Sequence, residues 1–170
     1  MTMSLWRIAT DTPDYTADDL TGKGAEITGG RWNRAGTPVV YAATNIALAT
    51  LETLVHFNTT DLPLNRILVR LDVPDDIWVV RTILTRHTAK VGWNVSPAGK
   101  VSLDAGDAWL DSVATVLMEV PSAIVPEEAN VLLNPRHPGI AQISAVRTRL
   151  FLYDTRLPMT GGLAPARRKK

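Results

Sequence analysis

Short apolar stretches separated by turn-forming residues constrain the fold of this chain more than any other feature of its sequence. These stretches are rich in β-branched side chains and are bounded by prolines and glycines, a pattern typical of strands. Because regularly alternating helices do not join them, the pattern favours an α+β fold with a mixed or antiparallel sheet and a few helices over a doubly wound parallel sheet. Strands are expected at residues 4–10, 37–43, 66–74, 76–82, 114–125, 129–135 and 148–154.

Length and charge limit the kind of domain that the chain can form. It has 170 residues, 45% of them hydrophobic, which is enough for one domain with a hydrophobic core. A net charge of +1 argues against a broad nucleic-acid-binding face, which needs many phosphate contacts. The one cationic cluster is the terminal "ARRKK". We therefore predict a single compact domain at residues 1–157 and a basic flexible C-terminal tail at residues 158–170.

Several classes of site and location are excluded by residue types and spacings. The chain has no cysteine, and its three histidines stand at no metal-ligand spacing, so no metal is expected. No apolar run approaches the ~18 residues of a membrane span, and the first residues lack the features of a signal peptide. The glycine-rich "GKGAEITGG" matches neither the dinucleotide fingerprint nor the P-loop. A cytoplasmic protein without membrane contact is expected.

Helices are few in this sequence. The clearest is "TNIALATLETLVHF", residues 44–57, with Thr44 or Asn45 as the N-cap. A long polar loop is expected at residues 11–30, with one helical turn near residues 17–20. A second loop leads to a short helix at residues 107–112. Long loops inside compact domains are often functional, so the first of these is a candidate part of a site.

Glu52 occupies an unusual position on the clearest helix. Helical spacing predicts an apolar stripe of Leu48, Leu51, Leu54 and Val55, and Glu52 falls inside that stripe. A carboxylate removed from water needs hydrogen bonds or a cationic partner. Two interpretations stay open, namely a boundary glutamate whose carboxylate reaches solvent and a functional carboxylate that faces a pocket.

The stretch before this helix combines glycines, an arginine and aromatic residues. Gly29 and Gly30 can adopt backbone conformations closed to other residues, and Arg31 beside such a turn can present its planar fork to a phosphate. Tyr41 ends the strand that leads into the helix, where its ring can line a cleft and stack on a flat ligand. Purely structural roles stay open for each residue, with Trp32 as a core anchor and Arg31 as a surface charge.

Together and in order, these motifs resemble the RES domain, the toxin half of a bacterial toxin–antitoxin pair, named for an arginine, a glutamate and a serine. The resemblance covers about residues 5–157. Arg31 matches the motif arginine, Glu52 the glutamate and Ser122 the serine, while Tyr41 and Arg7 match further pocket positions. The segments that carry it are "WRIA", "GGRWNRAGTPVVYAA", "ALATLE", "VPSAIVPEEANVLLNPRHP" and "LFLYDTRL".

The resemblance implies a fold similar to the ADP-ribosylating toxins, with NAD+ as substrate, no metal, and an Xre-type antitoxin that covers the active site. The implied reaction cleaves the nicotinamide–ribose bond. Glu52 would stabilise the cationic ribose, and Arg31 and Arg7 would bind the pyrophosphate. For the remaining contacts, the expectation is that Tyr41 and Trp32 hold the nicotinamide and that Ser122 and Asn134 hydrogen-bond to the ribose hydroxyls or the nicotinamide amide.

Three functions remain open at this point. The first is a toxin that transfers ADP-ribose to a protein target, with an NAD+ phosphorylase or glycohydrolase as the nearest alternative. The second is a non-catalytic module that binds a nucleotide or a partner through the same cleft. The third, a toxin acting on RNA, fits the near-neutral charge and the lack of a histidine pair less well.

Overall fold

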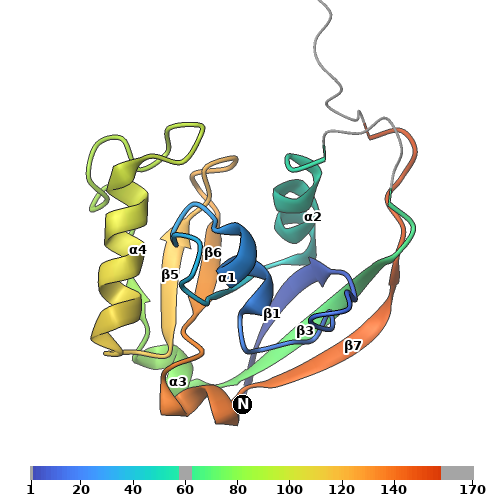
Figure 1. The fold of residues 1–170 in the computed structure, drawn as a ribbon, viewed down its shortest axis with the longest axis horizontal. Helices are drawn as coiled ribbons and strands as arrows, with labels where there is room; N and C mark the ends of the chain where they lie inside the picture. The colour runs from blue at the N-terminus through green and yellow to red at the C-terminus, as the bar shows by residue number, and fades with distance from the viewer. Residues whose placement is uncertain (1, 58–62, 158–170) are drawn as a thin grey trace, which may run out of the picture.

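The computed structural model describes residues 2–57 and 63–157, which form one seven-stranded sheet with helices around it (Figure 1). The strand order is β4-β5-β6-β2-β1-β3-β7, and neighbours are antiparallel except β4 and β5, which are parallel. This confirms the predicted α+β class with a mixed sheet. The predicted tail lies outside the described residues.

The elements are β1 (Thr2–Ala9), α1 (Lys23–Thr28), β2 (Val40–Ala43), α2 (Ile46–Leu54), β3 (Arg66–Pro74), α3 (Asp75–Val79), β4 (Thr82–Ile83), α4 (Lys100–Ser112), β5 (Leu117–Pro121), β6 (Ala129–Leu133), the 3-10 helix η1 (Pro138–Gln142) and β7 (Ser144–Phe151).

Strand alternation gives the sheet two apolar faces with different coverings. One face carries side chains such as Leu5, Leu71 and Val131 and packs against residues outside the sheet, including Ile77 of α3. On the other face, α4 packs on β5 and β6 through Trp109 and Leu110, and α2 packs on β1 and β2. Figure 1 shows α4 and α2 standing apart along the sheet. The second face therefore has two separate apolar clusters, one under each helix.

Helix α2 begins where the sequence predicts, but its buried face differs from the predicted stripe. The side chain of Asn45, and not that of Thr44, caps the helix by accepting a hydrogen bond from the amide of Leu48 at 2.8 Å. Leu51 and Val55 are exposed, at 39% and 47% of their surface. The buried residues are Leu48 and Ala49, so the inward face continues to residue 52 at helical spacing.

Two predicted elements are wrong in type or position. A strand was expected at residues 76–82, but Asp75–Val79 form α3: Pro74 precedes it and two aspartates occupy its first turn, where negative charge suits the helix dipole. Helix α4 starts at Lys100 and not near residue 107, because its inward face is built from the small residues Ser102 and Gly106 as well as Trp109 and Leu110. At the predicted helical turn near residues 17–20 the chain makes one hydrogen-bonded turn, from the amide of Asp19 to the carbonyl of Thr16, and the helix of this loop is α1 at Lys23–Thr28.

None of the helices in the two described segments is long and apolar enough to cross a membrane.

Candidate active site

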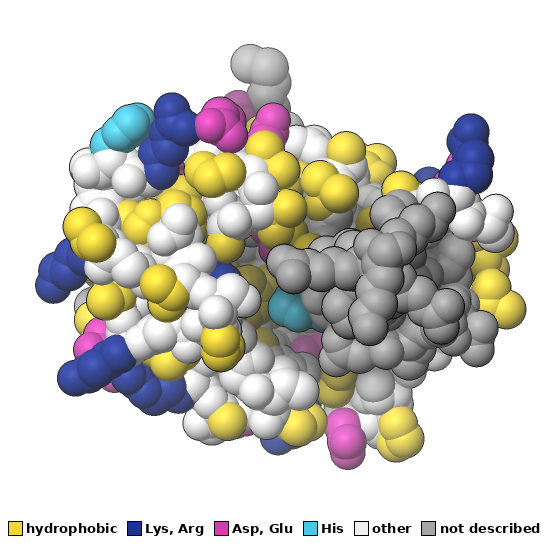
Figure 2. All heavy atoms as spheres, turned by 90° about the horizontal axis from the view of Figure 1, so that it is seen from above, with side chains coloured by type: hydrophobic (Ala, Val, Ile, Leu, Met, Phe, Trp, Pro, Cys, Tyr) yellow, Lys and Arg dark blue, Asp and Glu magenta, His cyan; other side chains and the backbone are white. Residues whose placement is uncertain are grey.

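A cleft of about 780 Å³ opens on the sheet face that carries α2 and α4. Its lining comes from β1, β2 and β6, from α2, from the turn at residues 28–32 and from residues 96–98 ahead of α4. Figure 2 looks onto this end of the molecule, where the surface is hollowed and charged side chains show inside the hollow. Among the predicted site residues, Arg7, Arg31, Trp32, Tyr41 and Glu52 line this one cleft.

The carboxylate of Glu52 is held at the cleft by two hydrogen bonds to the same oxygen. The hydroxyl of Ser122 donates to Oε1 at 2.7 Å, and the side-chain amide of Asn130 donates to Oε1 at 2.6 Å. Within the described residues no hydrogen bond is made to Oε2. One oxygen of the carboxylate is therefore fixed, and the other is free to meet a ligand.

Ser122 is itself held by the turn between β5 and β6. Its Oγ accepts hydrogen bonds from the amides of Ile124 and Val125, both at 3.1 Å. With these two donors on the oxygen, the single hydroxyl proton points to Glu52. Ser122 is fully buried and lies outside the cleft lining. In this structure the hydroxyl of Ser122 contacts the glutamate, and its predicted contact with ribose or nicotinamide stays a prediction.

Asn134, the other predicted hydrogen-bond donor to the ligand, has its partners within the protein. It is fully buried and outside the cleft lining. Its amide donates to the carbonyl of Leu110 at 2.9 Å, and its Oδ1 accepts from the amide of Arg136 at 3.0 Å. The first hydrogen bond ties the residue after β6 to α4, and the second closes a turn at residues 134–136, so both contacts serve the structure. Its neighbour in sequence, Asn130, is the one that faces the glutamate.

Arg31 is fixed by the loop ahead of α4. Its guanidinium Nη1 donates to the carbonyls of Trp93 and Val95, at 3.1 and 2.8 Å. The ring of Trp32 stacks on that of Trp93 at 6.2 Å between centroids and is 2% exposed. Trp32 therefore acts mainly as a core anchor that holds the turn, while the remaining donors of Arg31 stay available at the cleft.

The hydroxyl of Tyr41 serves the same turn. It accepts from the amide of Trp32 at 3.0 Å and donates to Oδ1 of Asn33 at 2.8 Å. Burial raises the pKa of Tyr41 well above its usual value, so the hydroxyl stays neutral. A side chain at residue 30 would bring a Cβ to 2.7 Å from this hydroxyl. Gly30 is thus required because the Tyr41 hydroxyl lies too close for a side chain. Gly29 is required for a different reason, since its positive φ of 69° is a backbone conformation that favours glycine.

Arg7 reaches the cleft from β1. Its Nη1 donates to the backbone carbonyl of Asp19 at 2.8 Å. Burial lowers the pKa of Arg7, and the negative charge of Asp19 acts in the opposite direction. The long loop at residues 11–30 therefore contributes to the site by holding an arginine.

Sequence analysis missed several residues of the cleft. Asn130 carried a usable signal, because it precedes the buried Val131 and must face the side of the sheet opposite to it. Tyr15, Asp19 and His56 also line the cleft, but nothing in their local pattern distinguishes them from ordinary surface residues. Arg66, at the start of β3, lines the cleft as well. Across the described part of the chain, no three side chains are grouped as metal ligands.

With this geometry in place, comparison with known proteins decides the family. The model of the RES domain matches residues 4–155. The chain belongs to the RES domain family. A "Prs ADP-ribosylating toxin" of Sphingobium sp. (strain YBL2) is 53% identical over 157 residues, which is 92% of this chain and 98% of the relative.

Other members of the family are more distant. The "Toxin Res" of Pseudomonas putida is 38% identical over 91% of this chain and 99% of its own length, and that of Yersinia enterocolitica is 36% identical over 91% and 99%. A solved structure, that of the M. tuberculosis MbcT-MbcA toxin–antitoxin complex, has a chain of the same fold, with a TM-score of 0.63 at 19% identity over 87% of this chain and 85% of that chain. This RES domain is therefore related to toxins over nearly all of its length.

Proposed function

We propose that this RES-domain protein is a cytoplasmic toxin that cleaves NAD+ at the nicotinamide–ribose bond and transfers the ADP-ribose to a protein. The observation that carries the proposal is the carboxylate of Glu52, fixed through one oxygen and open to the cleft through the other. The 53% identical relative is named for ADP-ribosylation of Prs, so we propose Prs as the first acceptor to test.

The free oxygen of Glu52 suits the charge that develops in this reaction. When the bond from ribose C1′ to the nicotinamide nitrogen breaks, its electron pair goes to the nitrogen and neutralises the pyridinium. The ribose is left with the positive charge of an oxocarbenium-like species, which a fixed carboxylate beside it stabilises. A nucleophile on the acceptor then forms the new bond to C1′ and releases its proton to solvent.

Fixing Oε1 reduces the reorganisation that the carboxylate would otherwise undergo. Both donors are neutral, so they orient the carboxylate without cancelling its charge. Because Ser122 is fully buried and Asn130 projects from a paired strand, the glutamate is preorganised before a ligand arrives. We assign Ser122 and Asn130 as positioning residues and Glu52 as the catalytic residue.

The rest of the cleft is suited to a dinucleotide. Its volume of about 780 Å³ lies within the usual range for small-molecule sites. Arg7 and Arg31 offer cationic donors for the pyrophosphate, and the ring of Tyr41 forms part of the wall where the nicotinamide would stack. Since the hydroxyl of Tyr41 is already engaged, only its ring is assigned to the ligand.

An antitoxin is the proposed regulatory partner. We propose that a cognate antitoxin of Xre type covers the cleft, as the family resemblance implies. Support comes from the apolar rim at Val55, which lines the cleft and is 47% exposed. Loss of NAD+ turnover on adding the purified antitoxin, with recovery on its removal, is the expected result.

Product analysis by mass spectrometry tests the reaction. Purified protein is incubated with NAD+ alone, with inorganic phosphate and with Prs. Free nicotinamide and ADP-ribosylated Prs are expected, while phosphorylated ADP-ribose or free ADP-ribose as the sole product would replace transfer by phosphorolysis or hydrolysis. Tight binding of NAD+ without nicotinamide release would instead indicate a non-catalytic module and overturn the proposal.

A further inference from the structure

Arg66 differs from every other arginine in residues 2–57 and 63–157. Each of the others donates at least one hydrogen bond to a carboxylate or a backbone carbonyl, whereas Arg66 makes none. Its Nε is buried and unpaired. Buried donors in native proteins almost always have a partner, so an exception requires a reason. Arg66 lines the same cleft as Glu52, which suggests that the partner is a ligand.

Aromatic side chains hold the guanidinium of Arg66 in place. Its Cζ lies 5.2 Å from the centroid of the Phe57 ring, and Phe57 meets Tyr153 edge-on at 5.4 Å. The hydroxyls of Tyr153 and Thr53 are 2.8 Å apart, and Thr53 directly follows Glu52 on α2. The group is therefore oriented without an acidic partner, and it is linked by packing to the helix that carries the catalytic carboxylate.

Arg66 and Arg31 belong to different ends of the site. Arg31 is tied to the loop of Trp93, within the apolar cluster under α4. The aromatic residues around Arg66 belong to the separate cluster under α2, together with Leu48 and Ala49. If Arg7 and Arg31 take the pyrophosphate of NAD+, Arg66 remains as a third cationic donor on the side of the cleft formed by α2.

We propose that Arg66 is the anchor of an oxyanion subsite that binds a phosphate group of the molecule that accepts ADP-ribose. The inference rests on the proposed function, because an acceptor presupposes transfer. Nε is buried, so the two Nη groups of the planar guanidinium are the donors whose fork matches two phosphate oxygens. The phosphate is either inorganic phosphate or a phosphate group carried by the acceptor, and both have the same chemistry at Arg66.

Binding can be measured separately from turnover by following the arginine Nε–H signals in ¹H–¹⁵N NMR spectra. Inorganic phosphate is titrated into the protein saturated with ADP-ribose, which occupies the pyrophosphate donors. A saturable shift of the Arg66 signal, identified by its loss in Arg66→Lys, is expected. An Arg66 signal that does not move, or that moves no more than that of Arg149, would overturn the subsite.

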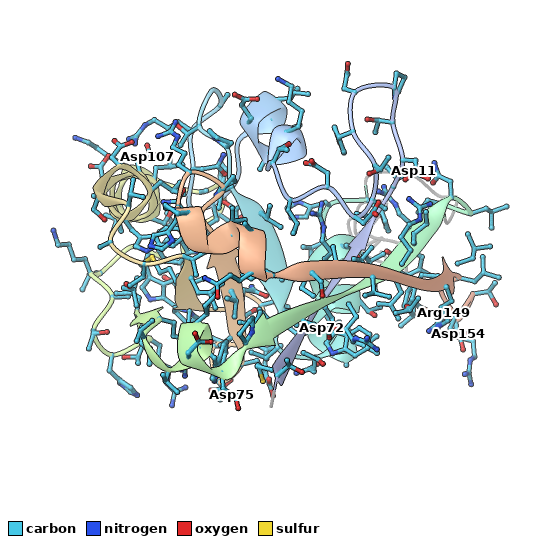
Figure 3. The ribbon with its side chains drawn as sticks, turned by 90° about the horizontal axis from the view of Figure 1, so that it is seen from below. Asp11, Asp72, Asp75, Asp107, Arg149 and Asp154 are labelled. Carbon is cyan, nitrogen blue, oxygen red and sulfur yellow. The ribbon has the colours of Figure 1, made fainter. Side chains whose placement is uncertain are left out.

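Arg149 is a matched control because it also stacks on a ring. Its Cζ lies 5.0 Å from the centroid of Phe151, but the residue is exposed on β7, donates to the carbonyl of Leu150 and is not part of the cleft (Figure 3). Arg149→Lys should therefore leave phosphate binding unchanged. In Arg66→Lys, where this signal is absent, phosphate binding is measured by calorimetry, and the dissociation constant should rise about tenfold or more, as for a lost charge-assisted hydrogen bond.

Turnover then distinguishes the two sources of the phosphate. If inorganic phosphate is the occupant, the yield of phosphorylated ADP-ribose falls in Arg66→Lys while hydrolysis persists. When the acceptor carries the group, transfer to Prs falls instead, and inorganic phosphate competes with Prs in the wild type. The Glu52→Gln variant should lose all of these products but keep the NMR shift, so failure of the catalytic proposal is separable from failure of the subsite.

Discussion

The cleft has two walls that use polar residues in opposite ways. At the turn wall, formed by residues 29–33 and Tyr41 against α4, the side chains of Asn33 and Tyr41 are engaged within the protein, and only Arg31 keeps donors for the cleft. Asn33 by itself donates to the carbonyls of Ala25, Arg34 and Thr37. At the carboxylate wall, formed by Glu52 and Asn130 with Ser122 buried behind them, one oxygen of the glutamate is fixed and the other is not bonded to a described residue.

The difference shows that burial of a polar group does not by itself indicate function. Asn33, Asn134 and Ser122 are all fully buried, yet only Ser122 contacts a group with a free hydrogen-bonding position in the cleft. A hydrogen-bonding group that faces a cavity and lacks a partner in the protein is a more specific sign of function. The turn wall is a scaffold, and the carboxylate wall is where chemistry is expected, so variants in the two walls should have different consequences.

Glu52→Gln should have the largest effect. The glutamine carbonyl can still accept from Ser122 and Asn130, so shape and folding are retained while the charge is removed. Nicotinamide release should fall by about 100- to 1,000-fold, or about 2.7–4 kcal/mol in barrier height, as when one electrostatic contact to the transition state is deleted. Steady-state kinetics with NAD+ measure the loss, with the KM little changed.

Thermal unfolding provides the control for this variant. The midpoint of Glu52→Gln should match that of the wild type. Undiminished turnover would remove the proposed role of the carboxylate, and a large drop in the midpoint would mean that the charge serves the fold.

Gly106→Ala tests the packing of the turn wall instead. A Cβ at residue 106 would lie 1.8 Å from the carbonyl oxygen of Trp32, so α4 and the turn must separate. Overpacking of this kind destabilises by about 3 kcal/mol. Denaturant unfolding measures the change, and Ala108→Gly, at an exposed position of the same helix, is a control with the opposite change in volume. A fully stable Gly106→Ala protein would contradict the close packing of this wall.

Asn130→Asp should have an intermediate effect that depends on pH. A carboxyl at residue 130 would face Oε1 of Glu52 at about the present 2.6 Å, and one pKa of such a pair is raised because both groups cannot readily ionise. The protonated pair keeps a hydrogen bond, whereas the doubly ionised pair repels. Activity relative to the wild type should therefore be about tenfold reduced near pH 8 and recover toward pH 5.

The ratio of variant to wild type is the measured quantity, because other titrating groups then cancel. His56, Tyr15 and Asp19 line the cleft in both proteins, as do the three arginines. A ratio that stays constant with pH would show that Asn130 acts only through the fold.

The sequence was sufficient to predict the fold class and most strands, and it marked Glu52 as unusual while leaving open whether its carboxylate reaches solvent or faces a pocket. Strands at residues 66–74 and 129–133 follow from β-branched runs, and Asn45 is a recognisable cap. Helix α4 was missed over half its length because its inward face uses Ser102 and Gly106, which carry no hydrophobic signal. Helix α3 was read as a strand because five residues are too few for a helical period to show.

The site was harder to predict than the fold. Motif matching identified Glu52, Arg31 and Ser122, but it could not show that Ser122 acts through Glu52. Asn130 and Arg66 come from β6 and β3, and only the sheet order brings these strands to the same cleft as α2. Contacts between residues far apart in sequence depend on register, and no local pattern encodes it.

Tyr41→Phe should have the smallest effect, on stability and not on chemistry. Loss of the hydroxyl leaves the amide of Trp32 and Oδ1 of Asn33 without this partner and should destabilise by about 1 kcal/mol near pH 7. The ring is retained, so nicotinamide release per folded molecule should stay within about twofold of the wild type.

The pH dependence of stability provides the sharper test of Tyr41. Its pKa is raised above the ordinary 10.0 by burial, so unfolding releases a more acidic phenol and wild-type stability falls as the pH rises above about 10. Tyr41→Phe lacks this loss, whereas Tyr153, whose pKa is also raised by burial, is present in both proteins and cancels. The stability gap between wild type and variant should therefore narrow from pH 9 to pH 11 in denaturant unfolding at about those two pH values. A gap that widens would mean that the folded protein favours the ionised phenol, and the turn wall would then hold a group poised for chemistry, as the carboxylate wall does.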